Sequence, residues 1–185
     1  KDTPGFIIAN KLLYEDGLLN EQYYQKVKEN AEAIESIIDY DLDYHFDYFA
    51  FTTLMRAYLL KYDGKVVERP QDLWMRVALT ISTDEFIFEK VKYTYSALSK
   101  GYYTHATPTL FNSGLKMQQL SSCFLIAMED DSIEGIFNTV KDCALISKTA
   151  GGIGLHAHNI RGSGSRIKST NGKSNGLIPF LKIFN

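Results

Sequence analysis

The residues best suited to chemistry gather in the stretch 106–176, which begins ATPTLFNSG and ends TNGKSNG. This stretch holds both cysteines, Cys123 and Cys143. Cys123 lies in a mostly apolar run and directly follows two serines, whose hydroxyls need hydrogen-bond partners if they are buried. A cysteine in such a run is either a small apolar core residue or a reactive thiol beside a polar ligand. Composition alone leaves both interpretations open.

Glycine-rich turns follow the second cysteine. The segment 150–154 (AGGIG) lets the backbone bend sharply or approach a ligand closely. The segment 161–166 (RGSGSR) has a cation at each end, and arginine together with backbone N–H groups in such turns suits phosphate oxygens. Neither segment has the spacing of a Walker A loop or of a dinucleotide fingerprint. A phosphate-binding loop and an ordinary surface turn both remain open for 161–166.

Two histidine placements indicate metal binding only weakly. His45 lies in the segment 39–51, where aspartates alternate with aromatic residues, but no second histidine stands at ligand spacing. That alternation is typical of an extended segment with one solvated face. His156 and His158 would share one face of a strand and supply two ligands at most. We therefore expect no metal site.

A strand–helix–strand unit is predicted to position these residues. Residues 119–127 predict a strand buried on both faces, as in parallel sheets. Residues 130–132 end that strand and cap a helix over 133–149, whose small side chains suit close helix packing. A second strand is expected over 153–160, and a last helix begins at Leu177. This order is that of an α/β sheet or barrel.

The preceding hundred residues predict a helical support. Residues 1–18 are expected to form a loose lead-in, followed by one helix that Asn20 caps and that runs to Ile38. Asp63 and Gly64 predict a hairpin with a type I′ turn.

Two more helices are predicted after the hairpin, one beginning at Arg69-Pro70 and one beginning at the capping-box spacing of residues 82–85. Gly101 is expected to end the second. A short helix is expected over 52–56, and Thr107-Pro108-Thr109 cannot lie in the middle of a helix.

Bulk properties exclude several classes of protein. The chain has 185 residues and a net charge of −2, so no basic field favours nucleic acid. No apolar run is long enough to span a bilayer. Two cysteines favour a reducing compartment over a disulfide scaffold. The apolar pattern over 177–184 favours a fragment of a longer protein.

Five stretches together resemble a known family: ATPTLFNSG, QLSSCFL, DDSIEGI, ALISKTAGGIG and TNGKSNGLIP. They are similar to the large, catalytic subunit of class I ribonucleotide reductase of the eukaryotic type. Upstream, YFAFTTLMRAYLLKYDGKVVERPQDLWMRVALTI resembles the segment before that family's barrel. The resemblance covers residues 38–185. It implies an α/β fold class, with a mainly helical region over 1–105 and the first two strands of a ten-stranded barrel over 106–185.

The resemblance implies reduction of ribonucleoside diphosphates by radical chemistry. Cys123 matches the first-strand cysteine of the redox pair, which delivers reducing equivalents and is re-reduced by thioredoxin or glutaredoxin through thiol exchange. Thr107 and Ser122 match substrate-binding positions, although relatives commonly have Ser at the first. Gly151 and Gly152 match the turn where the backbone meets the substrate.

The resemblance also implies an allosteric site for dNTP or ATP. The matching residues are Asp131, Ser132, Ile133, Lys148, Arg161 and Ile167. Asp131 suits a ribose hydroxyl and Arg161 suits a phosphate. In the family, this site lies at a homodimer interface made with the helix over 133–149.

No cofactor is expected to bind this chain directly, since the family's radical comes from the di-iron/tyrosyl centre of a small subunit. A cytoplasmic location is expected, without nucleic-acid or membrane partners. The family's ATP cone, second redox cysteine and thiyl-radical cysteine lie outside this sequence, so we expect the chain alone to be inactive. Two alternatives are a non-catalytic nucleotide-binding and dimerisation module, and a plain helical scaffold whose glycines only form turns.

Overall fold

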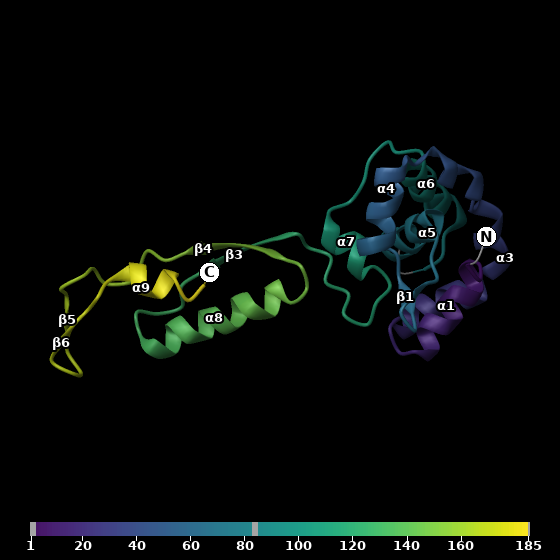
Figure 1. The fold of residues 1–185 in the computed structure, drawn as a ribbon. Helices are drawn as coiled ribbons and strands as arrows, with labels where there is room; N and C mark the ends of the chain where they lie inside the picture. Colours follow the sequence, from purple (N-terminus) through teal and green to yellow (C-terminus); the bar gives the residue numbers. More distant parts are fainter. Residues whose placement is uncertain (1–2, 83–84, 185) are drawn as a thin grey trace. The chain divides into compact units, whose positions relative to one another are not determined.

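The computed structural model describes residues 3–82 and 85–184. The chain divides into two compact units, Lys1–Leu120 and Ser121–Asn185. Figure 1 shows the first as a cluster of helices and the second as one long helix beside two strands.

A buried helix, α5 (Pro70–Ile81), forms the centre of the first unit, and ten of its 12 residues are buried. It packs against η1, α6 and α7. The prediction of a helix beginning at Arg69-Pro70 is confirmed: Pro70 lies in the first turn, and Asp72 accepts a hydrogen bond from the Arg69 N–H at 2.7 Å. The other elements of the unit are α1 (Phe6–Glu15), α2 (Glu21–Glu29), α3 (Ala31–Ile37), η1 (Tyr40–His45), α4 (Tyr48–Thr53), η2 (Leu54–Tyr58), β1 (Lys61–Tyr62), β2 (Lys65–Val66), α6 (Phe88–Ser99) and α7 (Thr107–Asn112).

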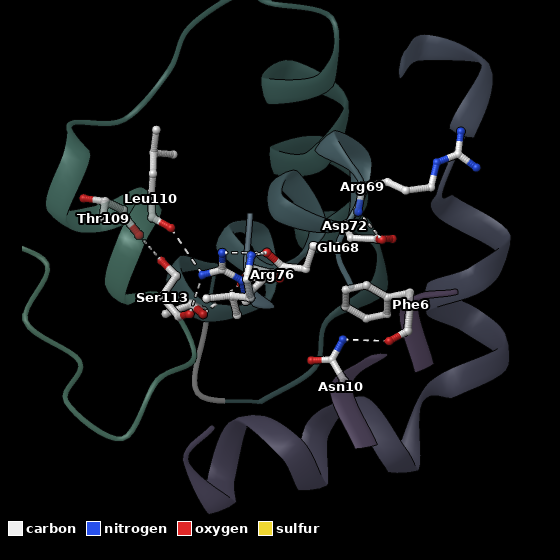
Figure 2. Close-up of polar contacts among 11 residues, drawn as sticks. Phe6, Asn10, Glu68, Arg69, Asp72, Arg76, Thr109, Leu110 and Ser113 are labelled. Carbon is white, nitrogen blue, oxygen red and sulfur yellow. Dashed lines mark hydrogen bonds and ion pairs between the residues drawn. The ribbon is translucent and has the colours of Figure 1, made fainter. Parts of the chain in front are cut away.

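A fully buried ion pair joins α5 to its surroundings (Figure 2). Arg76 Nε lies 2.6 Å from Glu68 Oε1, and Arg76 Nη2 donates to Glu68 Oε2 at 3.1 Å. Arg76 Nη1 donates to the carbonyls of Leu110 and Ser113 at 3.2 and 2.8 Å. Glu68 also accepts a bond from the Leu60 N–H at 2.8 Å. The pair therefore ties the hairpin and the end of α7 to the central helix.

A second polar cluster lies at the N-terminus of α5. The buried Asp72 carboxylate accepts a bond from the Tyr40 hydroxyl at 2.7 Å, and burial raises the pKa of Asp72 to about 7. Arg69 lies over the Tyr40 ring at 4.2 Å and pairs with Asp43 at 2.6 Å. These contacts hold η1 against the start of the central helix.

The predicted hairpin is confirmed. β1 and β2 pair antiparallel, with Lys61 opposite Val66 and Tyr62 opposite Lys65. The two turn residues, Asp63 and Gly64, have φ of 48° and 72°, as a type I′ turn requires.

The helix predicted from Asn20 to Ile38 begins as expected but is broken. The Asn20 side chain accepts a hydrogen bond from the Tyr23 N–H at 2.8 Å, which confirms the cap. Asn30, with φ of −121°, separates α2 from α3, and its side-chain amide donates to the Lys26 carbonyl at 2.9 Å. A local side-chain bond thus competes with helical continuation.

The expectation of a loose lead-in over 1–18 is wrong, because α1 fills most of it. Phe6, Ala9 and Leu13 are buried at helical spacing. Gly5, with φ of 87°, directly precedes this helix. The Pro4-Gly5 pair therefore marks a helix start and not a continuing loop.

The expectation of an extended segment over 39–51 is also wrong. Asp39 accepts a bond from the Asp41 N–H at 3.0 Å, and Asp47 accepts one from the Ala50 N–H at 2.7 Å. These aspartates cap η1 and α4 respectively. The short helix expected over 52–56 is instead the end of α4 followed by the π-helical turn η2.

The remaining expectations for this unit concern helix ends. Thr83 and Asp84 of the expected capping box lie outside the described residues, and α6 begins at Phe88. Gly101, with φ of 71°, follows the end of α6 as predicted. Pro108 lies in the first turn of α7, which agrees with its exclusion from a helix interior.

The second unit contains the predicted strand–helix–strand order: β3 (Cys123–Ala127), α8 (Ile133–Ser147) and β4 (Gly152–His156). The two strands pair in parallel, with Cys123 opposite Gly152 and Ala127 opposite His156. The predicted cap of α8 is confirmed, since Ser132 Oγ accepts a bond from the Gly135 N–H at 3.0 Å. A short hairpin and a last helix follow: β5 (Arg166–Ile167), β6 (Gly172–Lys173) and α9 (Leu177–Leu181).

The prediction that the first strand is buried on both faces is wrong within the described part of this unit. Exposure alternates along β3 and β4, and Leu125 is 93% exposed. Ile136 and Thr139 of α8 are buried, while the helix packs against both strands. One helix covers one face of a two-stranded sheet, so the other face stays open. Both strands are also shorter than the expected 119–127 and 153–160.

Candidate functional site

Cys123 lies at the start of β3, on the open face of the sheet, and is exposed. The Ser122 hydroxyl donates a long hydrogen bond to Cys123 Sγ at 3.7 Å. Because parallel strands begin at the same edge, Gly152 stands opposite Cys123, and its N–H donates to the Ser122 carbonyl at 2.7 Å. Three of the sequence-predicted residues thus meet at one sheet edge. The thiol is accessible here, unlike the small core residue that composition allowed.

The glycine turn before β4 is sterically restricted. A Cβ at Gly151 would lie 2.6 Å from Ile146 Cγ2 and 2.8 Å from the Phe124 ring, and a Cβ at Gly152 would lie 3.2 Å from the Ser122 carbonyl oxygen. Gly151 is therefore needed for packing between α8 and β3. Gly152 permits a close backbone approach beside the thiol.

Thr107, the remaining residue predicted to bind substrate, belongs to the first unit. It opens α7 and is half-buried, and its hydroxyl oxygen lies 3.3 Å from that of Tyr58.

A cavity of about 850 Å³ lies in the second unit. Its size is in the range of small-molecule sites in proteins. Five of the six residues predicted to bind an effector line it: Asp131, Ser132, Ile133, Arg161 and Ile167. They come from the start of α8 and from the segment that leads into β5, so the fold brings together residues some 30 positions apart.

An ion pair forms between two residues that line this cavity. Arg161 Nε lies 2.5 Å from Asp131 Oδ2, and Arg161 Nη2 donates to the Asp131 carbonyl at 3.1 Å. The side chains of Arg161 and Asp131 are 34% and 25% exposed, so a ligand can reach both. The two residues predicted to bind opposite ends of a nucleotide thus contact each other.

Lys148, the sixth predicted effector residue, does not line the cavity. It caps the C-terminus of α8, whereas Ile133 begins that helix. A helix of 15 residues is about 22 Å long. Lys148 therefore lies a full helix length from the other five residues within one chain.

The exposed side of α8 mixes apolar side chains with the charged Glu134 and Lys141. Ile133, Phe137 and Leu145 are 65%, 51% and 56% exposed, at spacings that place them along one side of the helix. Cys143 is half-buried on the same helix, and burial raises the pKa of its thiol. A thiol with a raised pKa is a poorer nucleophile at neutral pH. The structure thus distinguishes the two cysteines: Cys123 is exposed at a strand start, and Cys143 packs on a helix.

Two family models match the chain, one in each unit. The ribonucleotide reductase all-alpha domain matches residues 44–118, and the ribonucleotide reductase barrel domain matches residues 121–185. The chain belongs to the ribonucleotide reductase large-subunit family. This membership confirms the predicted fold class, a helical N-terminal layer followed by the start of the barrel.

Curated relatives support the same family. The chain is 55% identical over 168 residues to the ribonucleoside-diphosphate reductase large chain 2 of Saccharomyces cerevisiae, a match covering 91% of this chain and 19% of that protein. It is 53% identical to the large subunit of Arabidopsis thaliana, with 91% of this chain and 20% of that protein covered. The large subunit of Trypanosoma brucei brucei is 51% identical over 173 residues, with coverage of 91% and 20%. The chain thus spans about a fifth of the length of these relatives.

Several residues that line the cavity were not among those predicted to bind an effector: Ile136, Ser165, Arg166, Lys168, Ser169, Thr170, Ser174 and Phe180. For Arg166, the signal was present in the sequence, since it ends the RGSGSR loop that suits phosphate. For Phe180 and Ser174, no sequence signal exists, because their place in the lining depends on how α9 and β6 fold back.

The described residues contain neither a cluster of metal ligands nor a membrane-spanning helix. No group of three or more His, Cys, Asp or Glu among them could hold a metal ion. His156 and His158 do share a face, with ring centroids 4.2 Å apart. Within the same residues, no helix has the length and hydropathy needed to cross a membrane.

Proposed function

We propose that this chain is part of a ribonucleoside-diphosphate reductase large subunit in which Cys123 delivers reducing equivalents to the substrate. Overall, the substrate loses its 2′-hydroxyl as water and gains a hydrogen, while two thiols give up two electrons and two protons and form a disulfide. Cys123 is one of these thiols, and a cysteine outside this chain is the other. The observation that carries the proposal is the exposed Cys123 thiol at the sheet edge shared with Ser122 and Gly152.

The neighbours of Cys123 have separate roles in this proposal. The Ser122 hydroxyl lies where it can donate a hydrogen bond to the sulfur, which favours the thiolate that attacks in thiol exchange. Gly152 keeps side-chain atoms away from the sheet edge, so the substrate can approach the backbone. Thr107 contributes a hydroxyl to the substrate, and Gly151 keeps the turn tight.

The partners follow from the same proposal. A small subunit with a di-iron/tyrosyl centre supplies the radical, and thioredoxin or glutaredoxin re-reduces the disulfide. This chemistry is expected in the cytoplasm, where thiols are kept reduced.

The test uses the full-length large subunit together with its small subunit. Cys123→Ser is expected to abolish thioredoxin-driven reduction of a ribonucleoside diphosphate, because serine cannot form the disulfide. Cys143→Ser is the matched control and is expected to keep turnover near the wild-type rate. If the Cys123→Ser enzyme turned over at the wild-type rate with a dithiol reductant, the proposed redox role of Cys123 would be rejected.

We propose further that the cavity beside α8 is the allosteric site for dNTP or ATP. Asp131 would accept a bond from the ribose hydroxyl, while Ser132, Ile133 and Ile167 contact the nucleoside. The exposed Ile133, Phe137 and Leu145 side chains of α8 support a homodimer, in which a second copy would bring its own Lys148 towards the site. Asp131→Asn in the full-length subunit is expected to weaken the effector's control of substrate choice while unregulated turnover persists. Unchanged effector control would reject this assignment.

An alternative function is a non-catalytic module for nucleotide binding and dimerisation. It is favoured by one observation: the cavity and the exposed apolar side chains of α8 both lie within the second unit. Sedimentation of the isolated chain with and without dTTP tests it. A dimer that strengthens with dTTP supports the module, and a monomer indifferent to nucleotide opposes it.

A further inference from the structure

A cavity of about 570 Å³ lies in the first unit, beside α4, and has no part in the reaction proposed above. Four aromatic side chains line it: Tyr44, Phe46, Tyr48 and Phe51. Tyr44 and Tyr48 are 80% and 87% exposed, although burial of such large rings is favourable. Exposed apolar side chains that gather around a cavity of this size are typical of a binding site.

The cap of α4 explains why these rings meet. Asp47 accepts a bond from the Ala50 N–H at 2.7 Å, so the helix begins directly after it. Tyr48 and Phe51 are three positions apart on this helix and therefore lie on one side of it. Tyr44 belongs to η1, which ends two residues before the cap. The alternation of aspartates with aromatic residues thus folds into an aromatic lining around a turn.

Three of the four charged side chains that line this cavity are already paired. Asp43 pairs with Arg69 at 2.6 Å, and Glu68 pairs with the buried Arg76 at 2.6 Å. These two pairs carry no net charge. Asp47 is exposed and forms no ion pair among the described residues. The cavity therefore combines aromatic walls with one uncompensated negative charge.

This combination favours a cation that needs few hydrogen bonds. Aromatic faces attract cations, and clustered rings recognise quaternary ammonium groups in this way. A primary ammonium has three N–H donors to satisfy, but the carboxylates of Asp43 and Glu68 are held by arginines and Asp47 Oδ1 accepts the cap bond. A quaternary ammonium has no N–H donor, so the rings and the charge of Asp47 meet all its requirements.

We propose that the cavity beside α4 is a binding site for a small organic cation of the quaternary ammonium type. The rings of Tyr44, Tyr48 and Phe51 surround the cationic group, and Asp47 supplies the opposite charge. Binding at this site involves no covalent step. It is independent of the proposed redox and effector roles, because Cys123 and the effector cavity belong to the second unit.

The test measures the binding of three probes to the full-length large subunit by ligand-observed NMR. The probes are choline, its neutral isostere 3,3-dimethyl-1-butanol, and ethanolamine, whose ammonium keeps its N–H donors. Choline is expected to bind about fivefold more tightly than either of the others, because only its cation is fully served by aromatic rings. Absence of choline binding, or equal binding of choline and the neutral isostere, would overturn the proposal.

Substitutions of Tyr48 and Asp47 test the two parts of the site. Tyr48→Leu keeps an apolar side chain but removes the ring, and should weaken choline binding about fivefold while the neutral isostere changes by less than about twofold. Tyr48→Phe keeps the ring and should bind choline nearly as the wild type does. Asp47→Asn keeps the helix cap, since Asn caps as well as Asp, and should weaken choline binding about threefold.

Phe49→Leu is the matched control. Phe49 is the next residue of α4 and is 79% exposed, but it does not line the cavity. Because Phe49 and Tyr48 are both exposed, neither substitution disturbs the core. Phe49→Leu should change choline binding by less than about twofold, since its ring is not part of the cation site. Equal losses from Phe49→Leu and Tyr48→Leu, or no loss from Tyr48→Leu, would reject this cavity as the site.

Discussion

The two units use their charged side chains in opposite ways. In the first, Arg76 and Glu68 are fully buried and satisfy each other, and Arg69 pairs with Asp43 against the central helix. In the second, the described ion pair, Arg161 with Asp131, is partly exposed and lines a cavity. The two units also differ in the size of their apolar cores. Among the described residues, the buried apolar side chains of the second unit are those of Met128 and Ile136.

This contrast shows when a charged residue indicates structure and when it indicates binding. A buried pair whose hydrogen bonds are all made within the fold has no capacity left for a ligand. An exposed cation that forms no ion pair among the described residues, such as Lys168, has that capacity. The first unit therefore acts as a support, and the chemistry proposed for this chain depends largely on the second.

The largest expected effect on stability comes from disrupting the buried ion pair at the centre of the first unit. Glu68→Gln leaves the charge of Arg76 buried without a counterion and should lower the free energy of unfolding by about 3–5 kcal/mol. Urea denaturation followed by the fluorescence of Trp74, the chain's one tryptophan, measures it. A loss below about 1 kcal/mol would show that the pair is not buried as described.

The next effect concerns pH. The folded pKa of Asp72, about 7, lies above the unfolded value of 3.8, so the folded chain keeps a proton that the unfolded chain releases between these values. The free energy of unfolding should therefore fall as the pH rises from 4 to 7, by at most about 1.4 kcal/mol per unit. Burial also raises the pKa of Asp43, which acts in the same direction. Asp72→Asn should flatten this slope in urea titrations, and an unchanged slope would contradict the assignment.

A smaller loss of stability is expected when one helix cap is removed from each unit. Asn20 caps α2 and also donates to the Leu115 carbonyl and to Gln118. Asn20→Ala should cost about 1–2 kcal/mol. Ser132→Ala removes a single bond to the Gly135 N–H and should cost about 1 kcal/mol. Equal losses in denaturation experiments would mean that the long-range bonds of Asn20 contribute nothing.

The smallest expected effect is on stability at the proposed binding site. Asp131→Asn removes the partner of Arg161, but both side chains are partly exposed and the pair is screened. The free energy of unfolding should change by less than about 1 kcal/mol, in contrast to Glu68→Gln. A loss of several kcal/mol on denaturation would place the Arg161 pair with the structural pairs of the first unit.

Local signals predicted the parts of the fold that depend on neighbouring residues. The Asp63-Gly64 turn, the Asn20 cap and the Ser132 cap all form as the sequence indicated. The failures came from equally local signals with two meanings. The aspartates at 39 and 47 cap helical turns, although their alternation with aromatic residues also fits a strand.

Long-range contacts separate the features that a sequence pattern predicts from those that form only when distant segments meet in the folded chain. Caps, turns and the strand–helix–strand order depend on residues a few positions apart. The conformational preferences of these residues can be read from the sequence. The pairing of Arg76 with Glu68 and the Ser113 carbonyl depends on which segments meet after folding. So does the joining of Asp131 to Arg161, and the placement of Arg166 on the same cavity. No short sequence pattern encodes these meetings, because packing of the whole unit selects them.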